Sequence, residues 1–574
     1  MNKEEISQIF EELAMLAELN DESPFKSRAY MNAARIILDL TDDLETLVNE
    51  NSLTDIEGIG QNIAAKIVEL VNTGKLKSYD KLRALVPDGV FQMLKISGLG
   101  PKKVKVLWKK YAITNLGDLK MSCERHALKA LPGFGIKTEE NILAGIESLK
   151  KFSGKWLYIE AQRWAEEVLS DVAKIKGVVR VEIAGSIRRK KEVVKDIDIV
   201  AAADNSAHIM KAFVSLPYVD RIVQHGKTKS EVILNSGIQC DLRVVSNDEY
   251  PFALHHFTGS KEHNVRMRGL AKSKGIKMNE YGLFEGKSKR GIPCKDEADI
   301  FKAFGLDYIE PELREDMGEV DAAGEGVLPQ LIEGSDLKGI LHVHTNYTDG
   351  EATIEEMALA AKSRGYEYIA ICDHSQNLTV VGGLKPADVR KQHKEIDALN
   401  KRIKNFTILK GIEVDILADG SLDYSDKVLS SFDIVIAAVH TRFKMSEEDM
   451  TRRIIRAVEN PHVDILAHPT GRLLLTREPY LVDMKRVIDA IGNHKKAVEI
   501  NAHPQRLDLD WRWMRYAKGR GAKFAICPDA HSTDGIDNVI NGVNVARKGW
   551  LEKGDVLNCS DLKKCPTLFD RLHR

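Results

Sequence analysis

After residue 336, short runs of apolar residues recur along the chain, and most of them end at a histidine or an acidic residue. The runs cover residues 339–343, 368–372, 434–439, 465–467 and 497–500, with helical stretches between them. Strands that alternate with helices predict a parallel sheet closed into a barrel. Functional side chains of such barrels lie at the C-terminal ends of the strands. We therefore expect residues 336–574 to form a barrel with its chemistry at one end.

The strand ends of this predicted barrel carry an unusual number of metal-binding side chains. Imidazole and carboxylate groups together suit Mn²⁺, Zn²⁺ or Fe²⁺. Any one of these histidines alone would be an ordinary capping or core residue, but nine candidates exceed the needs of one ion. We predict two or three ions, with Glu413 as a bridge. The candidate ligands are His342, His344, Asp349, His374, Glu413, His440, His468, Asp529 and His531.

Residues 1 to about 150 have apolar positions at helical spacing, and one short glycine pattern occurs there three times. The copies are residues 56–60, 96–100 and 131–135, and lysines follow each one. One copy alone would be a plain helical turn, whereas three with lysines resemble helix-hairpin-helix motifs. Such motifs hold DNA phosphates without reading the base sequence. The predicted DNA-binding residues are Gly58, Gly60, Gly98, Gly100, Gly133 and Gly135.

Three aspartates form a second candidate metal site. Asp196 and Asp198 lie in a run of Val and Ile, and residues i and i+2 of a strand project from the same face. Asp241 lies in another apparent strand and completes a possible two-metal site. By itself the Asp-x-Asp pattern would indicate only the solvent-exposed face of a strand. Gly185 and Ser186 precede it, however, where backbone N–H groups and a hydroxyl can bind phosphate. We expect Mg²⁺ or Mn²⁺ at these carboxylates.

A chain of 574 residues is too long to fold around one hydrophobic core, so about three to five domains are expected. The net charge of −1 argues neither for nor against nucleic acid. Seven dispersed cysteines are typical of reduced thiols, and the sequence has no apolar signal segment or membrane span. A cytoplasmic, nucleoid-associated monomer without membrane contact is expected. The predicted boundaries are 1–85, 86–150, 151–245, 246–317, 318–335 (a linker rich in Gly, Glu and Asp) and 336–574.

The segments 185–189 and 196–198, together with Asp241, resemble the palm of family X DNA polymerases, and the run 256–264 is similar to that family's sugar-contacting turn. The resemblance covers residues 1–317 and implies a lyase-like domain, a fingers-like region, an α+β palm and a thumb. One departure is His256, which stands where many relatives carry Tyr, so discrimination between sugars is open. The resemblance implies catalysis by Asp196, Asp198 and Asp241, and nucleotide binding by Gly185, Ser186, Arg189, Phe257, Gly259, Lys261, Asn264 and Arg268.

Lys66 follows the first glycine pattern at the place where the family's lyase domain carries a Schiff-base lysine. Lys26 and Tyr30 also match family positions, but Asn32 and Asn62 replace lysines of lyase-active relatives. Lys66 is therefore either a catalytic lysine or a lysine that only contacts DNA.

The C-terminal region resembles the polymerase and histidinol phosphatase (PHP) domain, a distorted seven-stranded (β/α)₇ barrel, with all nine ligand positions filled. The resemblance implies hydrolysis of phosphoesters with metal-activated water. The leading hypothesis is a DNA-directed polymerase that fills short gaps in repair, using deoxynucleoside triphosphates and gapped or nicked DNA. Its PHP domain would supply 3′-5′ exonuclease and possible abasic-site endonuclease activity. The alternatives are an untemplated nucleotidyltransferase, or a DNA-binding scaffold with a PHP phosphatase.

Overall fold

The computed structural model describes residues 3–40, 44–96, 98–129, 131, 133–286 and 291–562. Ser97 and Pro132 of the glycine patterns, and residues 563–574 at the end of the predicted barrel, lie outside these ranges. The chain divides into two compact units, Met1–Ser153 and Gly154–Arg574, and each is described by itself. Within the described residues, no helix is both long and apolar enough to cross a bilayer.

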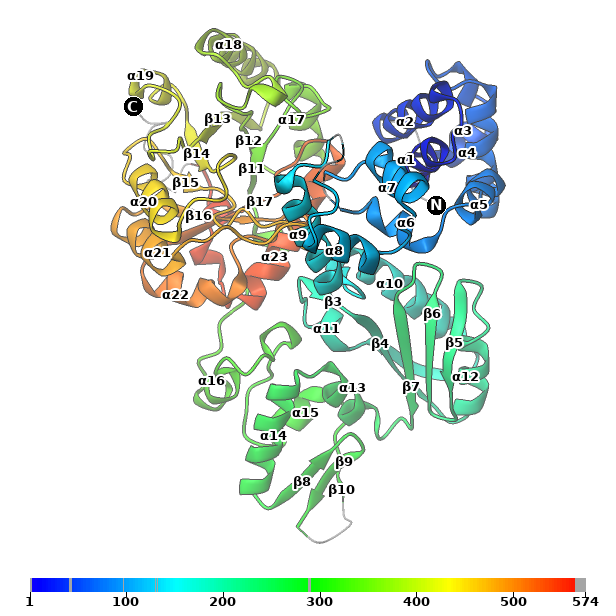
Figure 1. Ribbon diagram of the computed structural model, residues 1–574. Helices are drawn as coiled ribbons and strands as arrows, with labels where there is room; N and C mark the ends of the chain where they lie inside the picture. Colours follow the sequence, from blue (N-terminus) through cyan, green and yellow to red (C-terminus); the bar gives the residue numbers. More distant parts are fainter. Residues whose placement is uncertain are drawn as a thin grey trace. The chain divides into compact units, whose positions relative to one another are not determined.

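The first unit is helical, as predicted (Figure 1). Two apolar clusters stabilise it, one built around Phe10 and Ile67 and the other around Leu107 and Phe134. The helices are α1 (Lys3–Leu19), α2 (Pro24–Asp39), α3 (Leu44–Asn49), α4 (Gln61–Thr73), α5 (Lys77–Ala84), α6 (Asp88–Met93), α7 (Pro101–Tyr111), α8 (Leu116–Glu124) and α9 (Ile136–Phe152).

Each glycine pattern forms a tight turn that leads into a helix. The first glycines of the three copies, Gly58, Gly98 and Gly133, have φ of 90°, 80° and 83°, values that residues with a Cβ atom rarely adopt. The second glycines, Gly60, Gly100 and Gly135, are the N-cap residues of α4, α7 and α9. Because a helix N-terminus leaves backbone N–H groups unpaired, each turn offers a surface suited to an anion.

The second unit begins with a five-stranded sheet, here called the palm sheet, in the order β2-β4-β7-β6-β5. β4 and β7 pair in parallel, and the other neighbours are antiparallel. α10 (Tyr158–Lys174) and α12 (Ser206–Phe213) supply the apolar cluster on one face. The strands are β2 (Val178–Ile183), β4 (Asp196–Ala203), β5 (Val219–His225), β6 (Lys229–Leu234) and β7 (Gln239–Val245); β1 (Trp156–Leu157) pairs separately with β3 (Val193–Val194).

The thumb region follows, with its helices packed beside a three-stranded sheet around Phe301. It comprises α13 (Tyr250–Thr258), α14 (Lys261–Ser273), β8 (Ile276–Asn279), β9 (Gly282–Glu285), β10 (Gly291–Ile292), α15 (Glu297–Ala303) and α16 (Glu319–Glu325). α16 lies in the segment predicted as a linker, which is therefore ordered. Val320 and Ala323 join the thumb core, and buried Glu319 lies 2.7 Å from Nδ1 of His263. Glu319, one of the acidic residues that indicated a linker, thus forms a hydrogen bond with a buried histidine of the thumb region.

The remaining residues form a nearly closed barrel of seven parallel strands, which confirms the predicted architecture. A parallel bridge between Val343 and Ala530 joins the ends of the first and last strands. Alternate residues face an inner cluster and an outer one under the helices. The strands are β11 (Gly339–Val343), β12 (Tyr368–Ile371), β13 (Thr407–Asp415), β14 (Ile434–Ala438), β15 (Ile465–Leu466), β16 (Ala497–Asn501) and β17 (Lys523–Cys527). The helices are α17 (Ile354–Ser363), α18 (Pro386–Arg402), α19 (Asp426–Leu429), α20 (Glu447–Val458), α21 (Met484–Asn493), α22 (Met514–Gly519) and α23 (Val539–Lys548).

Candidate active sites

The three aspartates meet on the palm sheet. In the parallel pair β4–β7, Asp198 lies directly opposite Asp241, and Asp196 lies two residues earlier on β4. Gly185 starts α11 (Gly185–Arg188) immediately after β2, with φ of 60°. A Cβ atom at Gly185 would lie 2.0 Å from Oδ2 of Asp198, so only glycine permits this close approach. The fold thus brings the glycine-serine turn against the carboxylates.

Electrostatics favour a cation among these carboxylates. Burial, with the neighbouring charges of Asp196 and Asp241, raises the pKa of Asp198 to about 7. Burial also raises the pKa of Asp196. Nζ of Lys229 lies 3.2 Å from Oδ2 of Asp241, and the amide of Gln239 donates to Oδ1 at 2.9 Å. Three close carboxylates, with the pKa values of Asp196 and Asp198 raised, fit a divalent cation with a preference for oxygen ligands.

A cleft of about 420 Å³ opens beside Asp196 and Asp198. It brings together all eight residues predicted to bind the nucleotide, and His256 lines it with them. Nδ2 of Asn264 donates to the carbonyl of His256 at 2.7 Å, which ties α14 to the turn after α13. The guanidinium carbon of Arg243 lies 4.7 Å from the ring centroid of Phe257. The cleft therefore has carboxylates at one side and a turn braced by hydrogen bonds at the other.

The consecutive arginines 188 and 189 each pair with a glutamate of the thumb region. Arg188 donates to Glu297, which also accepts a 2.6 Å bond from fully buried Arg314. Arg189 Nε donates to Glu315 at 3.0 Å, and its Nη1 donates to the carbonyl of Thr258. The sequence alone does not identify these glutamates, because no local pattern marks an acid whose partner lies more than 100 residues away.

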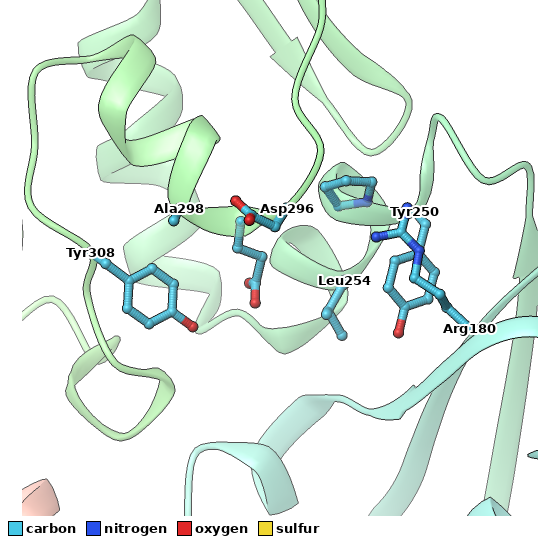
Figure 2. Close-up of a pocket in the computed structure, with 8 residues that line it drawn as sticks. Arg180, Tyr250, Leu254, Asp296, Ala298 and Tyr308 are labelled. Carbon is cyan, nitrogen blue, oxygen red and sulfur yellow. The ribbon is translucent and has the colours of Figure 1, made fainter.

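A separate cavity of about 300 Å³ lies where β2 meets the thumb region (Figure 2). Arg180 of β2 lines it and donates at 3.0 Å to the carbonyl of Lys295, and its guanidinium lies over the ring of Tyr250 at 4.7 Å. Tyr308, Asp296 and Leu254 form much of its remaining wall. None of the candidate metal ligands lines this cavity.

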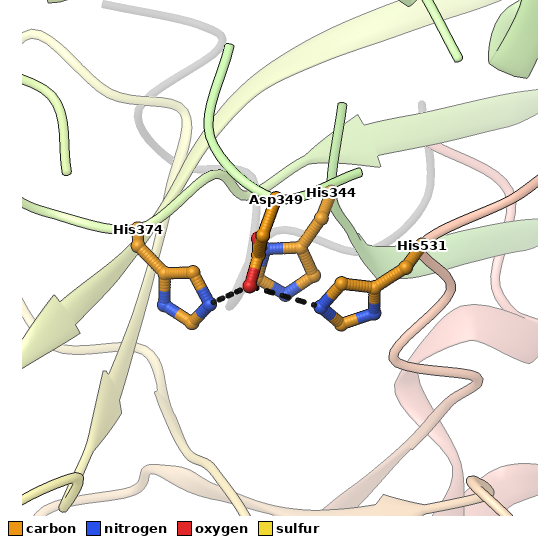
Figure 3. A group of neighbouring side chains, drawn as sticks. All are labelled: His344, Asp349, His374 and His531. Carbon is orange, nitrogen blue, oxygen red and sulfur yellow. Dashed lines mark ion pairs between the residues drawn. The ribbon is translucent and has the colours of Figure 1, made fainter. Parts of the chain in front are cut away.

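All nine residues predicted as barrel ligands converge. Figure 3 shows Asp349 between His374 and His531, with its Oδ2 at 3.3 and 3.5 Å from their Nε2 atoms. The side chains form three overlapping groups, and within each group the potential ligand atoms lie within 4.8 Å of one another. The groups are His344, Asp349, His374 and His531; His342, His344 and Asp529; and His374, Glu413 and His440. Nε2 of His468 lies 2.9 Å from Oε1 of Glu413 and completes the set.

Unpaired buried atoms show that these side chains fit metal ions. Nε2 of His342, both ring nitrogens of His344 and Oε2 of Glu413 are buried without a hydrogen-bond partner in the described part of the chain. Such atoms are costly unless a ligand binds them. Burial, together with His374 and His531, lowers the pKa of His344 to about 3, so its ring stays in the neutral form that binds metals. Burial opposes ionisation of Glu413, yet the surrounding histidines hold its pKa well below the ordinary value.

Two acids that the sequence did not predict as site residues orient two of the ligand histidines. Oε1 of Glu499 lies 2.5 Å from Nδ1 of His342, and Oδ1 of Asp415 lies 2.5 Å from Nδ1 of His440. Carboxylates in this position direct the other ring nitrogen toward a metal. Asp415 follows the ligand Glu413 by two residues on β13, a spacing that could have indicated it.

Arg442 and Arg472 follow ligand strands of the barrel, where a cation could hold a substrate phosphate. Arg472 instead pairs with Asp510 at 2.7 Å and donates to the carbonyls of Arg506 and Leu507. Its guanidinium is thus engaged within the fold. Arg442 is exposed and remains a candidate.

Lys66 lies on α4 in the first unit. Its ammonium donates to Oγ of Ser78 at 2.7 Å and lies 5.9 Å from the ring centroid of Tyr30. Burial lowers the pKa of Lys66, and the charge of Lys26 adds to this effect. A lowered pKa favours the neutral amine that a nucleophile needs. Lys26 itself is exposed and pairs with Glu22 at 2.7 Å.

Comparisons with protein families match the helical first unit, the thumb region and the barrel. Residues 1–76 match a helix-hairpin-helix domain, and residues 91–148 match a SAM-like helix-hairpin-helix tandem. Residues 253–315 match the DNA polymerase beta thumb, and residues 341–503 match the PHP domain. A polymerase-type nucleotidyltransferase joined to a PHP barrel is the class of protein that these matches and the fold define.

Individual relatives make the family more specific. The chain is 38% identical to the DNA polymerase/3′-5′ exonuclease PolX of Bacillus subtilis (strain 168), over 100% of both chains. It is 24% identical to DNA polymerase lambda of Rattus norvegicus, over 54% of this chain and 56% of the relative. A probable phosphatase of Thermoanaerobacter sp. (strain X514) is 30% identical over 39% of this chain and 91% of its own length. The chain belongs to the PolX family of DNA polymerases that carry a C-terminal PHP domain.

Proposed function

We propose that this chain is a DNA-directed DNA polymerase that fills short gaps during repair and carries its own 3′-5′ exonuclease. The observation that supports it best is the cleft beside the palm sheet. That cleft gathers Asp196, Asp198, the Gly185-Ser186 turn and the predicted sugar-contacting turn into one space. Full-length similarity to a relative named for both activities supports the same conclusion.

In the synthetic reaction, Asp196, Asp198 and Asp241 hold Mg²⁺ or Mn²⁺. When bound, these ions lower the pKa of the primer 3′-hydroxyl and neutralise the triphosphate. Ser186 and the N–H groups of the Gly185 turn bind phosphate oxygens, and Arg189 adds positive charge. Phe257 and Gly259 lie under the sugar, while Asn264 and Arg268 contact the minor groove at the nascent pair. The three glycine turns of the first unit hold DNA phosphates.

For the hydrolytic reaction, the nine barrel residues, with Glu413 central among them, would hold two or three Mn²⁺, Zn²⁺ or Fe²⁺ ions, which would activate a water molecule. Glu499 and Asp415 fix the ring orientations of His342 and His440. We assign 3′-terminal nucleotide removal, and cleavage at abasic sites, to this centre. We further propose that the protein acts as a monomer in the cytoplasm with the nucleoid, because DNA is the common substrate of both reactions.

Single-nucleotide incorporation into gapped DNA tests the synthetic assignment. The four deoxynucleotides are supplied one at a time against each of the four template bases. The proposal predicts incorporation of the complementary base, dependent on a divalent cation. Incorporation that ignores the template base would favour an untemplated nucleotidyltransferase instead. A complete lack of metal-dependent incorporation would leave only a DNA-binding scaffold with a PHP phosphatase.

A further inference from the structure

Lys548, at the end of α23 in the barrel, is buried against the polymerase part of the same unit. Its side chain is fully inaccessible to solvent. The ammonium has three acceptors: Oε1 of Glu315 at 2.6 Å, the carbonyl of Arg189 at 3.0 Å and the carbonyl of Glu312 at 3.3 Å. All three belong to the palm or thumb segments and none to the barrel. The barrel thus contributes a charge to the region that surrounds the nucleotide cleft.

Glu315 connects this lysine to the cleft. The same Oε1 that accepts from Lys548 also accepts from Nε of Arg189, at 3.0 Å. Arg189 lines the cleft with Asp196 and Asp198, and its Nη1 donates to the carbonyl of Thr258. Its Nη2 has no hydrogen-bond partner among the residues that the structure describes. Glu315 therefore fixes the guanidinium at Nε and leaves a nitrogen available to a ligand.

Neighbouring contacts hold Lys548 in this position. The ring centroid of Trp511 lies 4.6 Å from Nζ, and Nε1 of Trp511 donates to Glu192 of the palm segment at 3.3 Å. Arg547 pairs with Glu312 at 2.8 Å. Burial lowers the pKa of Lys548 to about 8, and Glu315 counteracts this effect. A lysine is rarely buried completely, and when it is, it requires partners such as these.

We propose that Lys548 is a positioning residue for nucleotide incorporation: it holds Glu315, and through Glu315 it orients the Arg189 guanidinium toward the phosphates of the incoming nucleotide. This inference rests on the proposed polymerase function of the cleft. It gives the PHP barrel a second role, because a barrel residue then completes the synthetic site in addition to any hydrolysis at the histidines.

The test compares Lys548→Met with Lys553→Met, an exposed barrel lysine that pairs with Asp336. Single-nucleotide incorporation is measured on gapped DNA while the deoxynucleotide concentration is varied. Removal of 3′-terminal nucleotides is measured on the same preparations. Loss of a hydrogen bond to a charged group predicts a KM for the deoxynucleotide raised roughly 10- to 100-fold in Lys548→Met. The affinity for DNA and the hydrolytic rate should match those of the wild type and of Lys553→Met.

Glu315→Gln separates positioning from folding, because it keeps Lys548 and the side-chain volume. It should raise the same KM, and combining it with Lys548→Met should add little, since both act on Arg189 along one path. An unchanged KM in Glu315→Gln overturns the inference, whether or not Lys548→Met folds. The inference is also overturned if the KM increases of the two single variants multiply in the double variant. Equal losses of incorporation and hydrolysis in Lys548→Met would overturn it as well. A wild-type protein that fails to incorporate nucleotides would instead refute the underlying polymerase proposal.

Discussion

Asp198 and Asp241 lie directly opposite each other on the parallel strands β4 and β7. The two aspartates are 43 positions apart in the sequence, and parallel pairing places their carboxylates side by side on one face of the sheet. The same register aligns Asp196 with Gln239. Gly185 closes against this pair, with room for hydrogen but not for a methyl group. The geometry of the synthetic site therefore depends on a residue that offers no side chain.

Gly185→Ala should reduce nucleotide incorporation by about 100-fold or more, because a displacement of about 1 Å in a catalytic group costs this much. The new Cβ would lie 2.0 Å from Oδ2 of Asp198 and must displace it. The rate of incorporation into gapped DNA is the measurement. Gly519→Ala is the control, since a Cβ there meets no atom within 4 Å. Full activity in Gly185→Ala would show that Asp198 has no role in the reaction.

Glu297→Gln should lower the free energy of unfolding by about 3–5 kcal/mol, because it leaves buried Arg314 without its carboxylate. Burial favours the neutral acid, but Arg314 and Arg188 lower the pKa of Glu297. Its stabilising contribution is therefore fully present above the unfolded-state pKa of about 4.3, and it is lost as the pH falls below that value.

Urea unfolding of Glu297→Gln and wild type, followed from pH 7 downward, measures this contribution. The difference between the two proteins should shrink in acid. Glu325→Gln, an exposed position on α16, should match the wild type throughout. A difference that is constant with pH would exclude a charge interaction as its origin.

Asp415→Asn should weaken metal binding at the barrel by about 10- to 100-fold, since the carboxylate orients His440. Titration with Mn²⁺, followed by electron paramagnetic resonance, measures the affinity directly. Asp419→Asn, at an exposed acid in the segment that follows β13, serves as the control. Equal affinities in the two variants would remove Asp415 from the metal centre.

Lys66 should form a covalent adduct with DNA that carries a 5′-terminal abasic sugar, after reduction with borohydride. Burial lowers the pKa of Lys66, so the neutral amine and the adduct should increase as the pH rises toward that pKa. Lys66→Ala should abolish trapping, while Lys75→Ala, at an exposed position, should not. Trapping that persists in Lys66→Ala would leave Lys66 as a DNA contact only.

The sequence predicted those parts of the molecule in which local pattern and position coincide. β4 and β7 are apolar runs that present aspartates, and every barrel strand except β16 is an apolar run with a ligand in it or just after it. β5 was missed because most of its residues are exposed, so it lacks the alternation of a half-buried strand. α16 was missed because its acidic composition is typical of linkers.

Long-range pairing could not be found in the same way. Glu297, Glu315 and Lys548 acquire their roles from partners on other elements, and nothing in the neighbouring sequence distinguishes them from surface charges. Glu499 lies in an apolar strand, and its neighbours in the sequence do not identify the histidine that it orients. Only the three-dimensional contacts reveal these pairs.

The central claim is that synthesis and hydrolysis use two separate metal centres. Its most direct test measures extension and 3′-terminal degradation of one gapped DNA substrate by two double variants. Asp196→Ala with Asp198→Ala should abolish extension and leave degradation intact, whereas His342→Ala with His344→Ala should do the reverse. Loss of both activities in either folded variant would contradict the assignment of two independent sites.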